Sequence, residues 1–195
     1  MGAEILIPVI VLVVLVPAVS FWAKRRFQND GSGDDDDLPV TPADRFTSNA
    51  LRELESPPWR VTYEIGADRL GGIGHVLIGP SGVYGLRTTM DPLPGPPSGD
   101  PDARAIGEAA VARAELDDAL RRCAMSSDRL VTVHWGANEG SEIAVDLLPG
   151  HTAVDGRSLT TWAAGTGPET LSSAQVDLAW QSVVTAIGRP DPLVD

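Results

Sequence analysis

The segment Gly71–Met90, GGIGHVLIGPSGVYGLRTTM, decides how this chain of 195 residues folds. It holds two runs rich in β-branched and aliphatic residues, Ile73–Ile78 and Val83–Thr88, on either side of the tetrapeptide Gly79-Pro80-Ser81-Gly82. Proline presets the φ angle that a turn needs, and glycine accepts backbone angles that other residues avoid. The pattern therefore predicts a β-hairpin, with four side chains directed into the core: Val76, Ile78, Val83 and Leu86.

Further helices and strands are predicted on both sides of this hairpin. Thr41-Pro42 is a favourable start for a helix that continues to about Glu55, and Trp59–Ile65 alternates as a strand. After a proline-rich loop, the rest of the chain predicts a long helix at Ala103–Ala124, strands at Leu130–Trp135, Glu142–Leu148 and His151–Val154, a helical turn at Leu159–Ala163 and a last helix at Ser173–Ile187. This order predicts an α/β fold, an α+β mixed sheet of four to six strands with helices packed on it.

The spacing of apolar residues assigns an inward face to each helix. In the first helix this face consists of Phe46, Ala50, Leu51 and Leu54. In the long helix it consists of Ile106, Ala110, Val111, Ala114, Leu116 and Leu120, and in the last one of Val176, Trp180, Val183, Val184 and Ile187. Four tryptophans also fall on apolar faces and are expected in the core: Trp59, Trp135, Trp162 and Trp180.

The N-terminal part of the chain predicts a membrane anchor. Ile5–Ala23 contains no charged residue and is long enough to cross the hydrocarbon core of a bilayer as a helix. Lys24-Arg25-Arg26 follow directly, whereas the only charged side chain before the run is Glu4, and this order is typical of a stop-transfer segment with its basic flank in the cytoplasm. The alternative is a signal peptide cleaved near Ala18-Val19-Ser20. The interpretation is a single-pass protein of the cell membrane, bound to the lipid bilayer through Ile5–Ala23, with a cytoplasmic C-terminal domain.

Composition divides the chain into four regions: the anchor with its basic flank at 1–26, an acidic flexible linker at 27–41, the folded domain at 42–188 and a C-terminal tail at 189–195. From Leu38 onward there are 12 arginines, no lysine and 21 acidic residues, a net charge of −9. Nucleic-acid-binding proteins usually present a basic face, because neutralising phosphates supplies much of their affinity. A nucleic-acid partner is therefore not expected. The lone Cys123 excludes an intrachain disulfide.

The segment Ile73–Tyr84, IGHVLIGPSGVY, resembles the central hairpin of the nuclease-related domain (NERD) family, whose pattern reads roughly I-D-H-V-V-V-G-P-x-G-V-F-x-I-[DE]-x-K. Upstream, Ala43-Asp44 precede Ala50-Leu51 at the spacing of a Gly-Glu pair and an Ala-Leu step in that family. Downstream, Val133–Gly136 and the pattern from Gly150 to Trp162 are also similar to it. The match covers most of residues 42–187. It implies a restriction-endonuclease-like α-β-β-β-α-β domain of the kind found in membrane-anchored bacterial proteins, including actinobacterial ones.

The chemistry of that fold is metal-assisted phosphodiester hydrolysis, in which carboxylates hold a divalent cation and a lysine assists. Residue by residue, the family's helix acid falls on Asp44, its aspartate on Gly74, its second acid on Arg87 and its lysine on Thr89. An arginine at position 87 is expected to put a positive charge where the cation would sit. The resemblance therefore implies a degenerate domain without catalytic, cofactor or metal residues. Such a domain would serve as an interaction or scaffold module for an unidentified protein partner.

Two alternatives stay open. The first is a divergent metal-dependent nuclease with an atypical site built from Asp44, Glu64, Asp68 and His75. Against it, neighbouring strand residues point to opposite faces, so positions 74 and 75 are not expected to project together. The second is an extracytoplasmic, membrane-tethered binding domain. His75, His134 and His151 lack the spacing of metal ligands and are expected to be structural, and Ser81 lies in a strand–turn–strand context unlike a nucleophile elbow.

Overall fold

The fold is described from a computed structural model of the chain, which describes residues 40–63, 65, 70–96, 103–138 and 140–188. The predicted anchor Ile5–Ala23, most of the linker and the C-terminal tail lie outside these residues, as do Glu64 and Asp68. In the ranges that are described, no helix combines the length and the apolar composition that crossing a bilayer requires.

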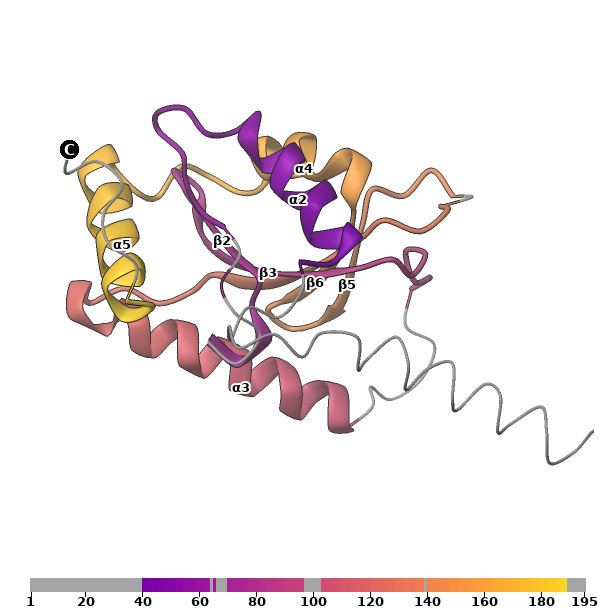
Figure 1. The fold of residues 1–195 in the computed structure, drawn as a ribbon, viewed down its shortest axis with the longest axis horizontal. Helices are drawn as coiled ribbons and strands as arrows, with labels where there is room; N and C mark the ends of the chain where they lie inside the picture. Colours follow the sequence, from indigo (N-terminus) through magenta and orange to yellow (C-terminus); the bar gives the residue numbers. More distant parts are fainter. Residues whose placement is uncertain (1–39, 64, 66–69, 97–102, 139, 189–195) are drawn as a thin grey trace, which may run out of the picture. The chain divides into compact units, whose positions relative to one another are not determined.

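A mixed sheet forms the centre of the domain (Figure 1). In the described residues it has six strands: β1 (Arg60–Thr62), β2 (His75–Gly79), β3 (Gly82–Thr89), β4 (Arg129–His134), β5 (Ala144–Leu148) and β6 (His151–Asp155). They stand in the order β1-β2-β3-β4-β6-β5. The strands β3, β4 and β6 run parallel to one another, while β1, β2 and β5 each pair antiparallel with their neighbours. This sheet confirms the prediction of a mixed α/β fold.

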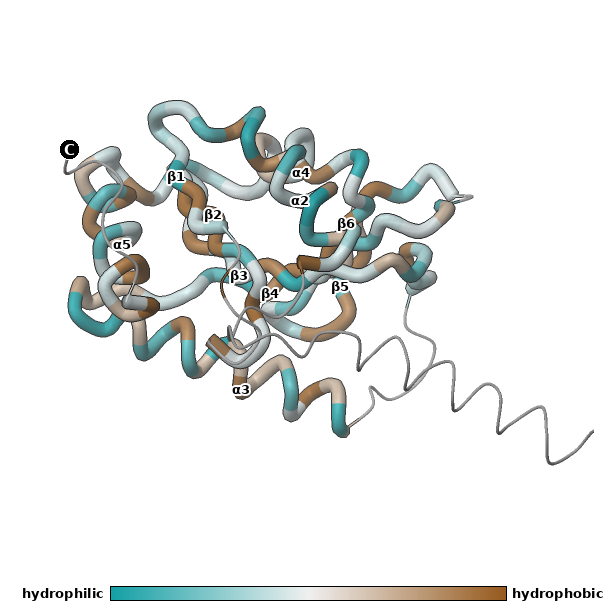
Figure 2. The backbone as a smooth tube through the Cα atoms, viewed as in Figure 1, coloured by the Kyte–Doolittle hydropathy of each residue, from teal (hydrophilic) through white to brown (hydrophobic). Residues whose placement is uncertain are grey.

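Helices cover both faces of the sheet, which gives three layers (Figure 1). The helices α2 (Pro42–Arg52) and α4 (Leu159–Gly165) pack on one face, and α3 (Ala103–Leu120) and α5 (Ser173–Ala186) pack on the other. Short 3-10 turns complete the described elements: η1 (Leu70–Gly72), η2 (Arg121–Cys123) and η3 (Gly156–Ser158). Figure 2 shows the most apolar stretches of the chain along the central strands, between the two helical layers.

The predicted hairpin is confirmed and contributes side chains to both cores. Its two strands pair from His75 opposite Leu86 to Gly79 opposite Gly82. Val76, Ile78 and Val83 lie in the core beneath α3 and α5, whereas Leu77, Tyr84 and Leu86 lie in the core beneath α2 and α4. Asp128 closes the turn, because its carboxylate accepts a hydrogen bond of 2.7 Å from the Val83 amide.

Two of the predicted helix faces are partly wrong. Phe46 of α2 is 45 % exposed, and Ile106 and Val111 of α3 are 44 % and 55 % exposed. The residues that α2 buries are Ala43, Thr47, Ser48 and Leu51, and those that α3 buries are Ala109, Ala112, Leu116, Ala119 and Leu120. Small residues allow a helix to lie close to a sheet. In α2, a hydrogen bond of 2.7 Å from the Trp135 indole also satisfies the buried Thr47 hydroxyl.

Other boundaries and core positions follow the predictions more closely. The first strand is shorter than expected, since only Arg60–Thr62 pairs regularly, and the strand predicted from Glu142 begins at Ala144. In α5, Val176, Val183 and Val184 are buried and Trp180 is half-buried, and the C-cap residue Ile187 is also buried. Trp162 is buried, whereas Trp59 and Trp135 are half-buried and pack against the core beneath α2 and α4.

Candidate functional site

The start of α2 positions Asp44, the matched helix acid. Thr41 caps the helix, because its hydroxyl accepts a hydrogen bond of 3.2 Å from the Asp44 amide. In return, Asp44 Oδ2 accepts hydrogen bonds from the Thr41 amide at 3.2 Å and from the Thr41 hydroxyl at 2.6 Å. This reciprocal arrangement is a capping box, which the sequence Thr-Pro-Ala-Asp encodes locally. Asp44 is therefore held in place by the same residues that begin the helix.

The other carboxylate oxygen of Asp44 faces the sheet. Asp44 Oδ1 accepts a hydrogen bond from the Thr88 hydroxyl on β3, and it lies 3.8 Å from His75 Nε2 on β2. The His75 side chain is fully buried, and its ring meets the Tyr63 ring edge-on at a centroid distance of 6.2 Å. The carboxylate thus joins α2 to both strands of the hairpin.

Gly74 lies beside the same carboxylate. A Cβ atom placed on Gly74 would stand 3.3 Å from Asp44 Oδ1. Position 74 and His75 therefore approach one oxygen atom together, which contradicts the expectation that they point to opposite faces. The physical reason is that β2 begins only at His75. Gly74 belongs to the segment that leaves η1, where Gly71 and Gly72 have left-handed backbone angles, so strand alternation does not apply to it.

Arg87 and Thr89 do not reach this place. The Arg87 guanidinium lies on the α3 side of the sheet, where Nη2 donates hydrogen bonds to the backbone carbonyl oxygens of Gly71 and Glu108. Thr88, between them, faces Asp44, and the Thr89 hydroxyl donates to Asp91 Oδ2 at 2.7 Å. The expectation that Arg87 occupies the cation position is therefore wrong, because residues that alternate along β3 project to opposite faces.

The residues proposed for an atypical metal site are only partly described. Asp44 and His75 lie together, while Glu64 and Asp68 are outside the described residues. In the described part of the chain, no three His, Cys, Asp or Glu side chains gather closely enough to hold a metal ion. The three histidines do not converge. His75 faces α2, whereas His151 lies on β6 with its Nε2 atom 2.9 Å from the Thr132 hydroxyl, and His134 ends β4.

Thr41 and Thr88 are the site residues that the sequence reasoning missed. A signal for Thr88 was present, because period-two alternation from the core residue Leu86 puts Thr88 on the same face. The signal for Thr41 was its place as the helix cap with an acid three residues later. Neither pattern reveals the hydrogen bond between Thr88 and Asp44, because these two residues are 44 positions apart in the sequence.

Burial and hydrogen bonding shift the pKa of the Asp44 carboxyl group in opposite directions. Partial burial raises the pKa of its carboxyl group, but the hydrogen bonds from Thr41 and Thr88 and the nearby His75 outweigh burial and hold the pKa below its ordinary value of 3.8. The carboxylate is therefore charged at neutral pH and is stabilised in that form by hydroxyl donors.

This shift predicts a pH-dependent effect of Asp44→Asn. A carboxyl group whose pKa is lower in the folded state stabilises the fold fully above the unfolded-state value of 3.8, and this contribution is lost as the pH falls through the folded-state pKa. We expect Asp44→Asn to lower the free energy of unfolding by about 1 kcal/mol at neutral pH. The difference should shrink below pH 3.8. Denaturant unfolding of both proteins across this range measures it, and a difference that does not change on acidification would contradict the assignment.

The comparisons with known proteins add no relative to these observations. No family model matches the chain, and the searches of curated proteins and of solved structures found no match to it. The resemblance of the hairpin to the NERD family accordingly stays a prediction from the sequence.

Proposed function

We propose that this chain is a single-pass membrane protein whose cytoplasmic, NERD-like domain has lost the residues of a nuclease and acts as an interaction or scaffold module. The arrangement around Asp44 carries the proposal. A divalent cation of the hard class needs several oxygen ligands, with carboxylates prominent among them. Here one carboxylate accepts hydrogen bonds from two threonines, and the matched position beside it, Gly74, has no side chain.

The topology of the domain supports the resemblance at a coarser level. The antiparallel hairpin β2–β3 is followed by α3 and then by β4, which pairs parallel with β3. This is the order that the resemblance implies. The matched positions 44 and 74 also come together in space, although 30 residues of sequence separate them and they belong to different elements. A chance match of the short hairpin pattern would not require that proximity.

The competing function is a divergent, metal-dependent nuclease. The test uses the full-length protein in detergent, supplied with Mg²⁺ or Mn²⁺ and with double-stranded and single-stranded DNA. We expect no cleavage beyond that given by Asp44→Asn, which removes the charge and preserves the shape of the side chain. Asp118→Ala serves as the control, because Asp118 is an exposed acid near the end of α3 and forms an ion pair with Arg121 of η2. Metal-dependent cleavage that Asp44→Asn abolishes and Asp118→Ala retains would refute the proposal.

The membrane orientation has a separate test. A cysteine introduced at Ser32 in the linker, in a Cys123→Ala background, reports which side of the membrane the linker occupies. We expect an impermeant thiol reagent to label it only after the cells are permeabilised, because Lys24-Arg25-Arg26 favour a cytoplasmic flank. Labelling of intact cells would instead establish the extracytoplasmic alternative.

A further inference from the structure

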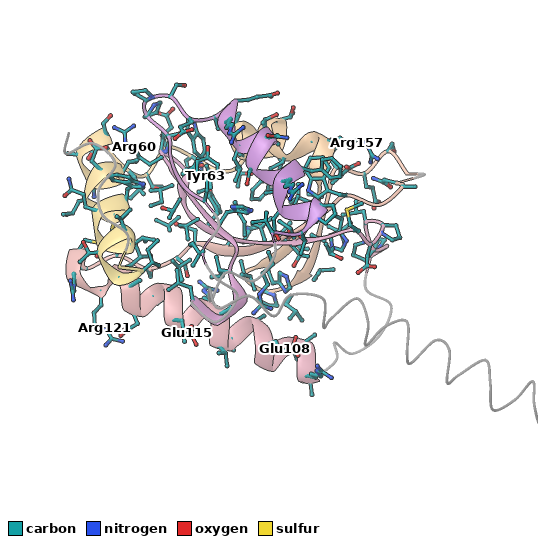
Figure 3. The ribbon with its side chains drawn as sticks, in the orientation of Figure 1. Arg60, Tyr63, Glu108, Glu115, Arg121 and Arg157 are labelled. Atoms are coloured by element: carbon teal, nitrogen blue, oxygen red, sulfur yellow. The ribbon has the colours of Figure 1, made fainter. Side chains whose placement is uncertain are left out.

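The first half of α3 borders a hollow on the surface of the domain. All residues from Ala103 to Glu108 are exposed, and so is Val111. The hollow has a volume of about 430 Å³ and is lined by Gly71, Arg87, Arg104, Gly107, Glu108 and Val111. Figure 3 marks Glu108 on this part of the helix. The hollow is on the α3 side of the sheet, so it is distinct from the Asp44 site on the α2 side.

Arg87 supplies this hollow with a positive charge that no described carboxylate neutralises. Its Nη2 atom is anchored by the carbonyl oxygens of Gly71 and Glu108, and neither contact involves a carboxylate. Its Nε atom is buried without a hydrogen-bond partner. Among the described residues its Nη1 atom makes no hydrogen bond, and Arg87 lines the hollow, so two N–H donors remain for a bound molecule.

The surroundings of Arg87 are consistent with an uncompensated charge. Arg104 contributes a second guanidinium to the lining, and its Nε atom lies 2.8 Å from Glu108 Oε1. On the neighbouring part of the sheet, burial lowers the pKa of His151, and the positive charge of Arg87 lowers this pKa further. This local charge contrasts with the net charge of −9 from Leu38 onward.

We propose that the hollow binds an organic phosphate, with its oxyanion on Arg87 Nη1 and its apolar part against Val111 and the two glycines. A guanidinium is the side chain best suited to phosphate oxygens, and small-molecule sites combine mostly apolar walls with a few directed polar groups. The inference rests on the proposed function as a binding module and names one class of ligand for it. A lipid headgroup and a free metabolite both offer this chemistry.

Gly107 gives a matched pair of variants for the test. A Cβ atom at this exposed helical position would meet nothing within 4 Å, so both Gly107→Ala and Gly107→Glu fit the fold. Gly107→Ala adds an uncharged methyl group to the same position, so it is the neutral reference for the added side chain. Gly107→Glu adds a carboxylate to the lining, where it competes with the ligand for the guanidinium groups. Arg87→Gln removes the charge itself, but it also disturbs the contacts to Gly71 and Glu108, so it is the secondary variant.

The measurement is calorimetric titration of the full-length protein in detergent with hexyl phosphate. We expect saturable binding by the wild type, and we expect Gly107→Glu to bind at least about tenfold more weakly than Gly107→Ala, a difference of about 1.4 kcal/mol. Inorganic phosphate should bind more weakly than hexyl phosphate, because it lacks the apolar part. The absence of wild-type binding, equal affinities of Gly107→Ala and Gly107→Glu for hexyl phosphate, or equal affinities of the wild type for the two phosphates would each overturn the inference.

Two further arms identify the source of the ligand and separate this inference from the proposed function. Dihexanoylphosphatidylglycerol presents a lipid phosphodiester in soluble form, so its binding supports a lipid headgroup, whereas binding of hexyl phosphate alone supports a free phosphate monoester. The same preparations enter the DNA-cleavage test. If the wild type neither binds hexyl phosphate nor cleaves DNA, only the phosphate site is overturned. If it cleaves DNA in a way that depends on Asp44, the proposed function is overturned.

Discussion

Gly79→Ala is expected to lower the free energy of unfolding by about 3 kcal/mol, the upper end of the range for overpacked positions. Gly79 ends β2 and pairs with Gly82 across the turn. A Cβ atom here would overlap the six-membered ring of the Trp59 indole, and Trp59 itself packs against the core beneath α2 and α4. The indole must therefore move, or the hairpin must shift, and denaturant unfolding would measure the loss.

Gly165→Ala is the control for this prediction. Gly165 ends α4, and a Cβ atom there would meet nothing within 4 Å. Its stability should change by less than about 0.5 kcal/mol, as is usual for exposed substitutions. Similar losses in both variants would show that Gly79 has no special role at the indole, and would contradict the packing described for the turn.

Gly74→Asp is expected to destabilise the domain by about 2 kcal/mol in the presence of a chelator, because a second carboxylate would stand beside Asp44 at low exposure. The backbone at Gly74 is not left-handed, so the substitution adds charge without backbone strain. A divalent cation should reverse the effect, since two adjacent carboxylates supply oxygen ligands. At a hundredfold excess over its dissociation constant, the bound ion would restore about 2.7 kcal/mol.

Gly74→Asn separates charge from size in this experiment. It places a side chain of the same shape beside Asp44, and its melting temperature should be the same with chelator as with Mg²⁺. The melting temperatures of the two variants, each with and without the ion, give the comparison. If Gly74→Asp is no more sensitive to Mg²⁺ than Gly74→Asn, positions 44 and 74 do not form the remnant of a cation site, and the resemblance to the family loses its structural support.

The hairpin and the order of elements could be predicted because their signals are local. The turn residues Gly79 to Gly82, the alternating strand pattern and the Thr41-Pro42 helix start each act within a few residues. The helix faces were predicted less well, because apolar periodicity assumes that the largest side chains are buried. In α2 the large Phe46 is exposed and rests at a ring distance of 5.5 Å on Trp135, while the small Thr47 and Ser48 lie against the sheet.

The candidate site shows the same limit. Sequence spacing identified positions 44, 74, 87 and 89. It could not show that Gly74 lies beside Asp44 whereas the Arg87 guanidinium lies on the opposite side of the sheet. This difference depends on the residue at which β2 begins and on the face of the sheet to which each β3 side chain projects. The hollow beside α3 was not foreseen at all, because Gly71, Arg87 and Gly107 come from three separate segments and carry no common pattern.

We propose that Asp44 is a structural carboxylate in a nuclease-like domain that has lost its catalytic residues. The most direct measurement is the melting temperature of the full-length protein and of Asp44→Asn, each with chelator and with Mg²⁺ or Mn²⁺. We expect the ions to change the melting temperatures of the two proteins equally, because hydroxyl donors from Thr41 and Thr88 already engage the carboxylate. A rise in the melting temperature of the wild type that Asp44→Asn abolishes would show a metal ion bound at Asp44, and would rule out a purely structural role for this carboxylate.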